Sequence, residues 1–330
     1  MGKAALLEVE NLSVTFATPR GLVPAVAQAS FTVGAGEVLG LVGESGSGKT
    51  VTLKAILRLL RASAQIGGKL LWRGEDILAM RPERLRALRG REIAMIFQEP
   101  MTALNPVLKI GVQIDEMLVA HTDLDRGARR RRAIELLDQV GIPAAATRLG
   151  QYPHEFSGGM RQRAMIATAL AAKPSLLLAD EPTTALDVTI QDQILTLLAS
   201  LTSELGMAMI LVTHDLGVVA QTCDRVCVMY AGEVVEAGAA ADVFEHPRHG
   251  YTSSLLATIA SALAPRSLLD AIPGQPSPPG ILREGCAFAP RCRYVEDGCR
   301  EGRMELRDIA PGHSSACLAE ARIPRRAEVP

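Results

Sequence analysis

The segment Gly43–Thr50, Gly-Glu-Ser-Gly-Ser-Gly-Lys-Thr, has the residue types and spacing of a loop that binds nucleotide phosphates. Its glycines let backbone N–H groups close around phosphate oxygens, Lys49 can reach the β- and γ-phosphates, and Thr50 offers a hydroxyl to Mg²⁺. The alternative, a glycine turn before a core helix, would leave Lys49 as an unpaired charge at a buried junction. The residues that we expect to contact the nucleotide are Gly43, Ser45, Gly46, Ser47, Gly48, Lys49 and Thr50.

Two adjacent carboxylates, Asp180 and Glu181, end an apolar run that begins at Ser175. A strand buried on both faces is continuously apolar, and ligands of open α/β sheets bind beyond the carboxyl ends of the strands. We therefore expect Asp180 to hold Mg²⁺, directly or through water, and Glu181 to act as the general base. Because a carboxylate pair alone is more often a solvated strand end, this interpretation depends on the other motifs.

Two more polar residues follow apolar runs, and a second glycine-rich segment begins a helical pattern. Gln98 follows the run 93–97, and His214 follows the run 209–213. Residues 157–159, Ser-Gly-Gly, have the character of a helix start that binds an anion. Because the chain already has one phosphate loop, this second anion site implies a second subunit.

Residues 156–163 resemble the signature of ATP-binding cassette (ABC) ATPases, usually written Leu-Ser-Gly-Gly-Gln, with Phe156 and Met160 at its first and fifth positions. The Ser-Gly-Gly core is intact, although Met160 cannot make the polar contacts of a glutamine. In the family two cassettes dimerise head to tail, and each signature caps the ATP held by the other cassette. The resemblance gives this capping role to Ser157, Gly158 and Gly159.

The same resemblance implies roles for other residues. Gln98 resembles the Q-loop glutamine that senses Mg²⁺ and the attacking water, and His214 resembles the switch histidine that contacts the γ-phosphate. Asp187 lies in the D-loop-like segment 185–187, at the expected cassette interface. Phe16 is placed to stack on adenine, although a plain core aromatic is nearly as consistent with its alternation with apolar neighbours. The implied catalytic residues are Glu181, His214, Gln98 and Lys49. The implied Mg²⁺ site consists of Thr50, Gln98 and Asp180.

The elements that must position these residues are those of an α/β fold, a P-loop NTPase of the ABC ATPase type. Residues 1–97 and 173–240 are expected to form the nucleotide-binding core with an antiparallel β subdomain. Residues 98–172 are expected to form a helical subdomain that carries the signature, and residues 241–330 a small C-terminal extension. Hydrophobic patterning predicts strands at 38–42, 93–97, 175–180 and 209–213, a hairpin at 225–236, and helices at 51–60, 160–172 and 188–205.

Within the extension, a tail that follows the proline-rich segment 273–280 carries four of the six cysteines, Cys286, Cys292, Cys299 and Cys317. Disulfides are disfavoured in a cytosolic chain, and so short a tail has little hydrophobic core of its own. We therefore expect a bound metal to stabilise the tail. Structural zinc prefers tight C-x₂₋₄-C pairs, which are absent, whereas iron–sulfur clusters accept wider spacings. His313 in place of one cysteine keeps Zn²⁺ open. Cys223 and Cys227 are expected to be simple buried thiols.

The extension and the motifs at 43–49, 98–106 and 246–251 resemble the D-type ATPase subunits of dipeptide, oligopeptide and nickel importers. The resemblance favours a [4Fe–4S] cluster held by the four cysteines. The implied partners are a non-identical F-type ATPase, two membrane permeases and an extracytoplasmic binding protein. The implied function is to couple MgATP binding and hydrolysis at a cassette dimer interface to peptide uptake, with nickel or another small solute as the alternative cargo.

Composition agrees with this interpretation. A chain of 330 residues with 48% hydrophobic content can bury a large core. Its net charge of −1 gives no basic footprint for nucleic acid, which disfavours the alternative of a soluble ABC ATPase acting on nucleic acid. No apolar run reaches the ~18 residues needed to cross a bilayer, and residues 1–9 suggest an edge strand rather than a secretory signal. We expect a peripheral protein at the cytoplasmic face of the cell membrane.

Overall fold

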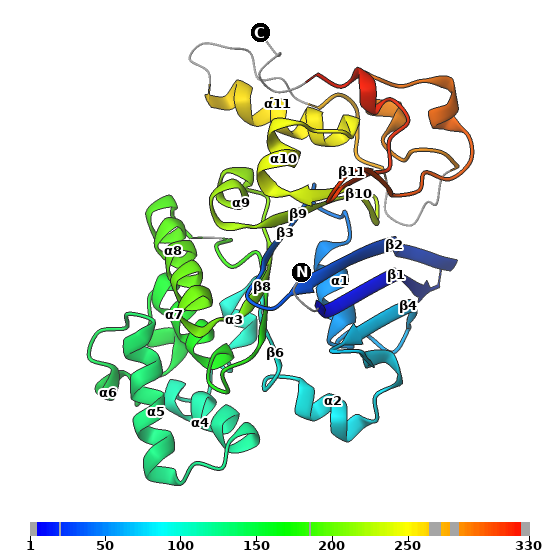
Figure 1. The fold of residues 1–330 in the computed structure, drawn as a ribbon. Helices are drawn as coiled ribbons and strands as arrows, with labels where there is room; N and C mark the ends of the chain where they lie inside the picture. Colours follow the sequence, from blue (N-terminus) through cyan, green and yellow to red (C-terminus); the bar gives the residue numbers. More distant parts are fainter. Residues whose placement is uncertain (1–4, 20, 185, 264–271, 278–283, 325–330) are drawn as a thin grey trace. The chain divides into compact units, whose positions relative to one another are not determined.

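The computed structural model describes residues 5–19, 21–184, 186–263, 272–277 and 284–324, and the chain divides into two compact units (Figure 1). The first, here the helical unit, is built mainly from Ala79–Val212 together with Gly34–Glu37. The second, here the phosphate-loop unit, is built from Ala5–Val33, Val38–Leu78 and Thr213–Pro330. Within the described ranges, no helix is long and apolar enough to cross a membrane.

The phosphate-loop unit contains a mixed sheet with the strand order β5-β4-β1-β2-β10-β9-β3, in which β12 also pairs with β10, and β11 with β12. Antiparallel pairing joins β1 to β4, whereas β3 runs parallel to β9. The strands are β1 (Ala5–Thr18), β2 (Gly21–Gly34), β3 (Val38–Val42), β4 (Ala64–Trp72), β5 (Glu75–Asp76), β9 (Arg225–Tyr230), β10 (Glu233–Ala239), β11 (Arg307–Ala310) and β12 (His313–Ser315).

The prediction of an edge strand at the N-terminus is wrong, because β1 lies between β4 and β2. Glu8 is compatible with a central position, since it lies opposite Leu71 and stays half-buried while its neighbours Leu7 and Val9 are buried. The predicted hairpin is confirmed as β9 and β10. Its two turn residues, Ala231 and Gly232, have φ angles of 49° and 87°, as a tight two-residue turn between twisted strands requires.

The helices of this unit are α1 (Lys49–Ile56), α9 (Leu216–Thr222), α10 (Ala240–Glu245) and α11 (Gly250–Leu263). Helix α1 ends earlier than the predicted 51–60, because Arg58 adopts a left-handed conformation with φ of 49°. The N–H of Arg58 donates to the carbonyl of Ala55 at 2.9 Å, and that of Leu59 to the carbonyl of Lys54 at 2.8 Å. These two bonds form a Schellman motif, which satisfies the last carbonyls of the helix and stops it.

The helical unit contains three parallel strands in the order β8-β7-β6, and every residue in them is buried. These strands are β6 (Ile93–Ile96), β7 (Leu176–Asp180) and β8 (Ala208–Val212). Figure 1 shows α4, α5, α7 and α8 gathered together in this unit. The helices are α2 (Pro82–Leu88), α3 (Pro100–Ala103), α4 (Ile110–His121), α5 (Arg126–Gln139), α6 (Ala145–Arg148), α7 (Gly158–Ala169) and α8 (Val188–Leu205). The strands predicted at 93–97, 175–180 and 209–213 and the helix at 188–205 are thereby confirmed.

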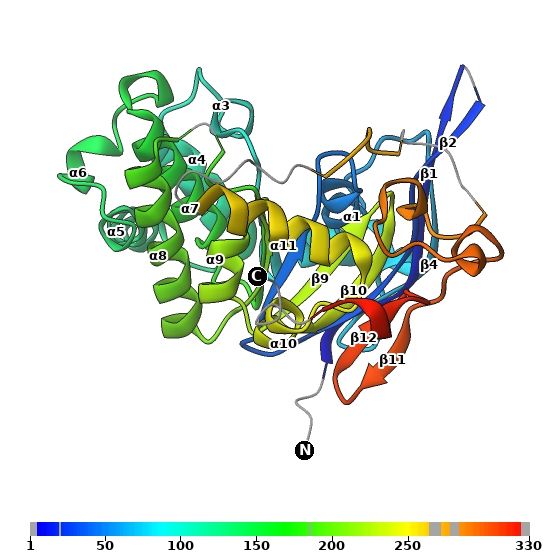
Figure 2. The same ribbon diagram turned by 90° about the horizontal axis from the view of Figure 1, so that it is seen from above.

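The last described part of the C-terminal extension, 284–324, consists mostly of loops with short 3₁₀ turns and the strand pair β11 and β12 (Figure 2). It packs a small apolar cluster made by Cys317, Ala319 and Ile323, with Tyr294 against them. Its strand β12 adds to the sheet by pairing with β10. The extension is therefore held to its unit by a strand pairing as well as by a small core.

A buried carboxylate reinforces this attachment. Glu236 on β10 is 0% exposed. Its oxygens accept the backbone N–H groups of Arg248 and His249 at 2.6 and 2.9 Å, and Nε2 of His313 lies 2.8 Å from Oε1. One side chain thus joins the hairpin, the segment before α11, and the extension. Burying a carboxylate is costly unless it is fully hydrogen-bonded, as it is here.

Replacing Glu236 by Gln is therefore expected to destabilise the phosphate-loop unit. The amide has one acceptor oxygen, so one of the two backbone N–H groups would face an NH₂ group. The expected loss is about 2 kcal/mol, seen as a lower Tm in thermal unfolding followed by circular dichroism. Glu296→Gln, which breaks an exposed pair with Arg322, is the control. Equal Tm values for the two variants would contradict this role.

Candidate functional site

Close packing around the phosphate loop explains two of its glycines. A Cβ on Gly43 would lie 2.1 Å from the carbonyl oxygen of Met229, and φ at Gly43 is 150°. A Cβ on Gly48 would lie 2.8 Å from the carbonyl oxygen of Ala25, and φ at Gly48 is 102°. Only glycine satisfies both the space and the backbone conformation at these positions. Gly46, by contrast, has open space around it and only a left-handed φ of 80°.

Lys49 begins α1 and is 5% exposed. Its Nζ donates to the carbonyls of Gly43 and Glu44 at 2.7 and 2.9 Å and lies 3.2 Å from Oγ of Ser47. The loop itself therefore pairs this charge, so the pairing of Lys49 does not by itself require a nucleotide. The ammonium nevertheless lies beside the backbone of the loop that would receive a phosphate, at a helix N-terminus.

Two other predicted site residues belong to the phosphate-loop unit. His214 is exposed and precedes α9, where the carboxylate of Asp215 accepts the N–H of Gly217 at 2.8 Å and caps the helix. Phe16 lies on β1 opposite Ala64 and is half-buried. The partial exposure of Phe16 leaves an aromatic face accessible, and its stacking on adenine stays a prediction.

The helical unit brings Gln98 and Glu181 together, as the sequence motifs indicate. Oε2 of Glu181 accepts Nε2 of Gln98 at 3.0 Å and Oγ1 of Thr184 at 2.9 Å. Glu181 has a φ of 45°, which is strained for a residue with a side chain, and its N–H donates to the carbonyl of Val212 at 3.0 Å. Asp180 ends β7 and is 2% exposed. Strain of this kind concentrates at functional positions.

The signature segment begins helix α7. Ser157 is exposed and caps the helix by accepting the N–H of Met160 at 3.3 Å. Phe156, at the position where the family usually has Leu, is buried and anchors the segment. A Cβ on Gly159 would lie 3.0 Å from Cγ2 of Ile190, so the glycine lets α7 approach α8 closely.

The D-loop-like segment leads into α8. Its first residue, Ala185, lies outside the described residues. Asp187 caps α8 by accepting the N–H of Ile190 at 3.0 Å. Asp187 therefore has a clear structural role at a helix N-terminus, and its expected place at a cassette interface stays a prediction.

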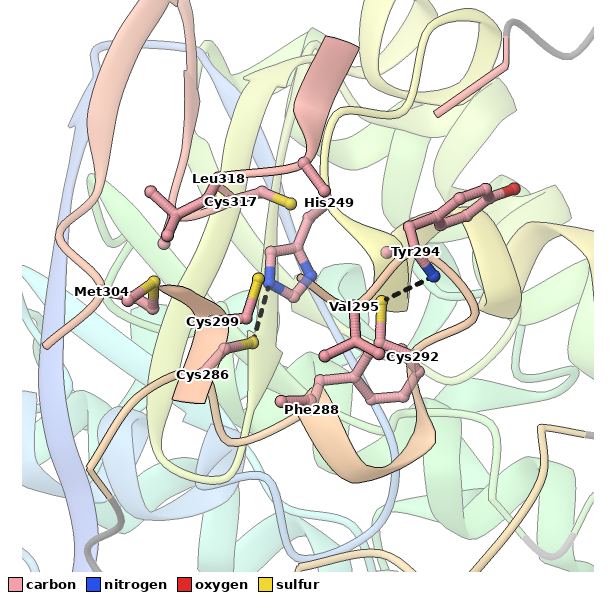
Figure 3. A pocket seen from close by; sticks show the side chains of 14 residues that line it. His249, Cys286, Phe288, Cys292, Tyr294, Val295, Cys299, Met304, Cys317 and Leu318 are labelled. Carbon is pink, nitrogen blue, oxygen red and sulfur yellow. Dashed lines mark hydrogen bonds between the residues drawn. The ribbon is translucent and has the colours of Figure 1, made fainter. Parts of the chain in front are cut away.

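The four cysteines of the extension line one small cavity of about 10 Å³ in the phosphate-loop unit (Figure 3). His249 also lines it, and its Nε2 lies 3.7 Å from Sγ of Cys286. The N–H of Tyr251 donates to Nδ1 of His249 at 3.1 Å, so the ring proton of the neutral imidazole is on Nε2, directed at this sulfur. Burial lowers the pKa of His249 to about 4, which keeps the ring neutral.

The four thiols of this cysteine pocket are buried or half-buried. Burial raises the pKa of Cys286 to about 12 and that of Cys317 to about 11. Backbone N–H groups two residues later in the chain oppose this shift, from Phe288 to Cys286 and from Ala319 to Cys317. The same arrangement recurs where the N–H of Tyr294 donates to the sulfur of Cys292 at 3.4 Å. The pocket therefore contains donors that favour thiolates as well as an apolar wall that disfavours them.

Within the described ranges, no group of three or more His, Cys, Asp or Glu side chains is arranged to hold a metal ion. The predicted cluster thus has no direct support in the donor geometry. The prediction that His313 could replace a cysteine in a zinc site is wrong. His313 pairs with Glu236 and does not line the pocket. Cys223 and Cys227 are buried free thiols, as predicted.

No sequence motif identified His249 as a residue of the cysteine pocket. His249 and Cys286 are neighbours in space although they are 37 positions apart in the chain. His249 does lie in the segment 246–251 that resembles the importer subunits, which was the only available signal.

Known families account for both parts of the chain. The profile of the family described as "ABC transporter" matches residues 26–184, and that of the "Oligopeptide/dipeptide transporter, C-terminal region" matches residues 235–299. The oligopeptide transport ATP-binding protein OppD of Salmonella typhimurium is 48% identical over 315 residues, which cover 95% of this chain and 93% of that protein. The chain belongs to the oligopeptide and dipeptide transporter family of ABC ATPases.

Further relatives agree with this membership. A putative peptide import ATP-binding protein of Brucella abortus is 49% identical over 315 residues, and the match covers 95% of this chain and 95% of that protein. Among solved structures, a dimeric ATP-binding cassette in a post-hydrolysis state with ADP and Pi matches with a TM-score of 0.64 and 28% identity. That match covers 71% of this chain and 98% of the cassette. The predicted ABC ATPase fold is therefore confirmed.

Proposed function

We propose that this chain is the ATP-hydrolysing subunit of an ABC importer for peptides. The observation that carries the proposal is the presence, in one chain, of a phosphate loop that closes on Lys49 and an extension of the oligopeptide transporter type. The relatives named for oligopeptide transport or peptide import match almost the whole chain. That naming favours peptides over nickel or another small solute, and it supports a peripheral position at the cytoplasmic face of the membrane.

In this proposal the chain's own residues bind ATP and activate water. Lys49 exchanges its loop carbonyls for the β- and γ-phosphates, and His214 adds a contact to the γ-phosphate. Mg²⁺, when bound, neutralises phosphate charge, and Thr50, Gln98 and Asp180 are the residues that would hold it. Glu181 accepts the proton of the attacking water. The contact between Gln98 and Glu181 supports this assignment, because it fixes the carboxylate at 3.0 Å from a residue that also serves the metal.

Glu181→Gln is expected to keep MgATP binding and to lower the rate of hydrolysis in the assembled transporter by about 10²–10⁴. The amide cannot take a proton from water, although it fills the same space. Phosphate release and equilibrium nucleotide binding measure the two effects separately. Glu204→Gln on α8, whose carboxylate accepts the Ser200 hydroxyl at 2.6 Å, is the matched control. Unchanged turnover in Glu181→Gln would remove this residue from the role of base.

We further propose that activity requires a second cassette, a non-identical F-type subunit, together with two permeases. The exposed, capped start of α7 supports a partner's ATP as the ligand of Ser157, Gly158 and Gly159. Exposed apolar side chains of Met101 and Val107 in the helical unit support a docking site for permeases. A groove of about 710 Å³ lined by α4 and α5 residues lies in the same unit.

Ser157→Arg is expected to abolish hydrolysis at the partner's site while MgATP binding at this chain's own Lys49 is retained. The long cation would displace the small cap that a γ-phosphate needs. Nucleotide binding by the isolated chain and turnover by the reconstituted complex are the two measurements. Ser200→Arg, on an exposed turn of α8, serves as the control. Full hydrolysis by a strictly monomeric preparation would contradict the two-cassette proposal.

We also propose a [4Fe–4S] cluster in the cysteine pocket, with Zn²⁺ as the alternative. Three observations support it: the four thiols line one cavity, backbone N–H groups point at three of the sulfurs, and His249 is neutral beside Cys286. Hydrogen bonds to sulfur and an apolar wall are the surroundings that tune such clusters. The cluster would supply a cross-link for an extension that has only a small core.

Protein purified without oxygen is expected to be brown, to absorb near 400 nm and to contain about four iron atoms per chain. Cys292→Ala is expected to lose the colour and the iron, whereas Cys223→Ala, in a buried thiol outside the pocket, is expected to keep both. Colourless protein with one zinc per chain would replace the cluster by zinc, and metal-free protein with an ordered extension would exclude both.

A further inference from the structure

We propose that the C-terminal extension positions the phosphate loop: Arg291 and Tyr251, which flank the cysteine pocket, hold Glu44 so that the loop is preset to bind MgATP. Glu44 is the second residue of the loop, a position at which the loop motif accepts any residue. The inference rests on the proposed function only in taking MgATP as the ligand of the loop. All of its contacts lie within the phosphate-loop unit.

Arg291 pairs with the carboxylate of Glu44 through both terminal nitrogens of its guanidinium. Nη1 lies 2.8 Å from Oε2 and Nη2 lies 3.0 Å from Oε1, which is a bidentate pair. The Arg291 side chain is only 5% exposed, and its Nε donates to the carbonyl of Pro273 at 2.9 Å. Nη1 also lies 3.2 Å from the hydroxyl of Tyr230. A buried fork with this many partners has one orientation, so it fixes Glu44 in place.

Tyr251 holds the backbone of the same residue. Its hydroxyl accepts the N–H of Glu44 at 2.7 Å, and the side chain is fully buried. The ring packs against Tyr230 and Phe288, with centroid separations of 4.6 and 5.3 Å. Because the carbonyl of Glu44 accepts Nζ of Lys49, the extension and the lysine both hold this one residue.

Both holding residues are attached directly to the cysteine pocket. Arg291 immediately precedes Cys292, and Tyr251 follows Gly250, where a Cβ would lie only 2.5 Å from Sγ of Cys292. The N–H of Tyr251 also donates to His249, which faces Cys286. A shift of the sulfurs therefore moves both contacts to Glu44. The loop's readiness for nucleotide depends in this way on how the pocket is packed.

The expected effect on the Kd for MgATP follows from the fraction of molecules that hold the loop in its binding conformation. If the loop is released, only a fraction of the molecules holds the binding conformation, and the apparent Kd for MgATP rises by the inverse of that fraction. Loss of one charge-assisted contact would release the loop enough to weaken binding by about five- to tenfold. Arg291 and Tyr251 do not contact the nucleotide in this scheme and are positioning residues.

The test measures MgATP binding to the full chain by titration calorimetry, together with hydrogen exchange of the amides of residues 43–50 without nucleotide. Arg291→Gln and Tyr251→Phe are each expected to raise the Kd about five- to tenfold and to speed loop exchange. Arg322→Gln alters an arginine of the extension that pairs with Glu296, and it is expected to leave both readouts unchanged. Tyr251→Phe removes one oxygen only and so guards against misfolding.

Two more variants show whether the effect passes through Glu44 and the pocket. Glu44→Gln combined with Arg291→Gln is expected to bind no more weakly than the worse single variant, because both remove the same contact. Cys292→Ala is expected to speed loop exchange in the otherwise unmodified chain but to add nothing when Arg291 is already Gln. Additive effects in either pair would overturn the route through Arg291.

The inference and the proposed function fail in different ways. If Arg291→Gln and Tyr251→Phe leave both binding and loop exchange unchanged while Lys49→Ala abolishes binding, the positioning role is overturned and the ATPase proposal stands. If the unmodified chain binds MgATP no better than Lys49→Ala, the ATPase proposal is overturned. Faster loop exchange in the two variants would still support the positioning role in that case.

Discussion

The crowding of the phosphate loop is the constraint on which the rest of the phosphate-loop unit depends. The carbonyls of Met229 and Ala25 approach Gly43 and Gly48 so closely that no side chain fits. The loop can therefore close on the buried ammonium of Lys49, which donates to the carbonyls of Gly43 and Glu44. Ala25 belongs to β2 and Met229 to β9, so strands from the beginning and from late in the chain together enclose the loop.

Contacts with the rest of this unit also explain why the extension is ordered. Its own apolar cluster is small, and a segment of that kind is ordinarily too weak to order itself. Order comes instead from polar contacts with the unit it joins: the strand pairing of β12, the buried carboxylate of Glu236, and the guanidinium of Arg291. Polar contacts of this kind are specific in direction, so they fix an orientation that an apolar patch alone would leave variable.

Much of the fold and of the site could be predicted because the signals were local. The phosphate loop, the strand that ends at Asp180 and the hairpin at 231–232 are each defined by neighbours in sequence, and the family resemblance ordered them. The position of β1 inside its sheet, the early end of α1 at Arg58 and the pairing of His313 with Glu236 depend on distant partners. No pattern within one segment contains that information, and the domain boundaries at 97, 172 and 240 stay predictions.

Helix α8 gives the helical unit a mechanical property. Its 18 residues form a rod of about 27 Å. The rod is clamped at its first turn by Asp187, six residues after Glu181, and it ends at Gly206 in a left-handed cap. Glu181 and Asp187 are only six positions apart in the chain. A small rotation at Glu181 would therefore sweep the far end of the helix through a larger arc, as the short arm of a lever moves the long one.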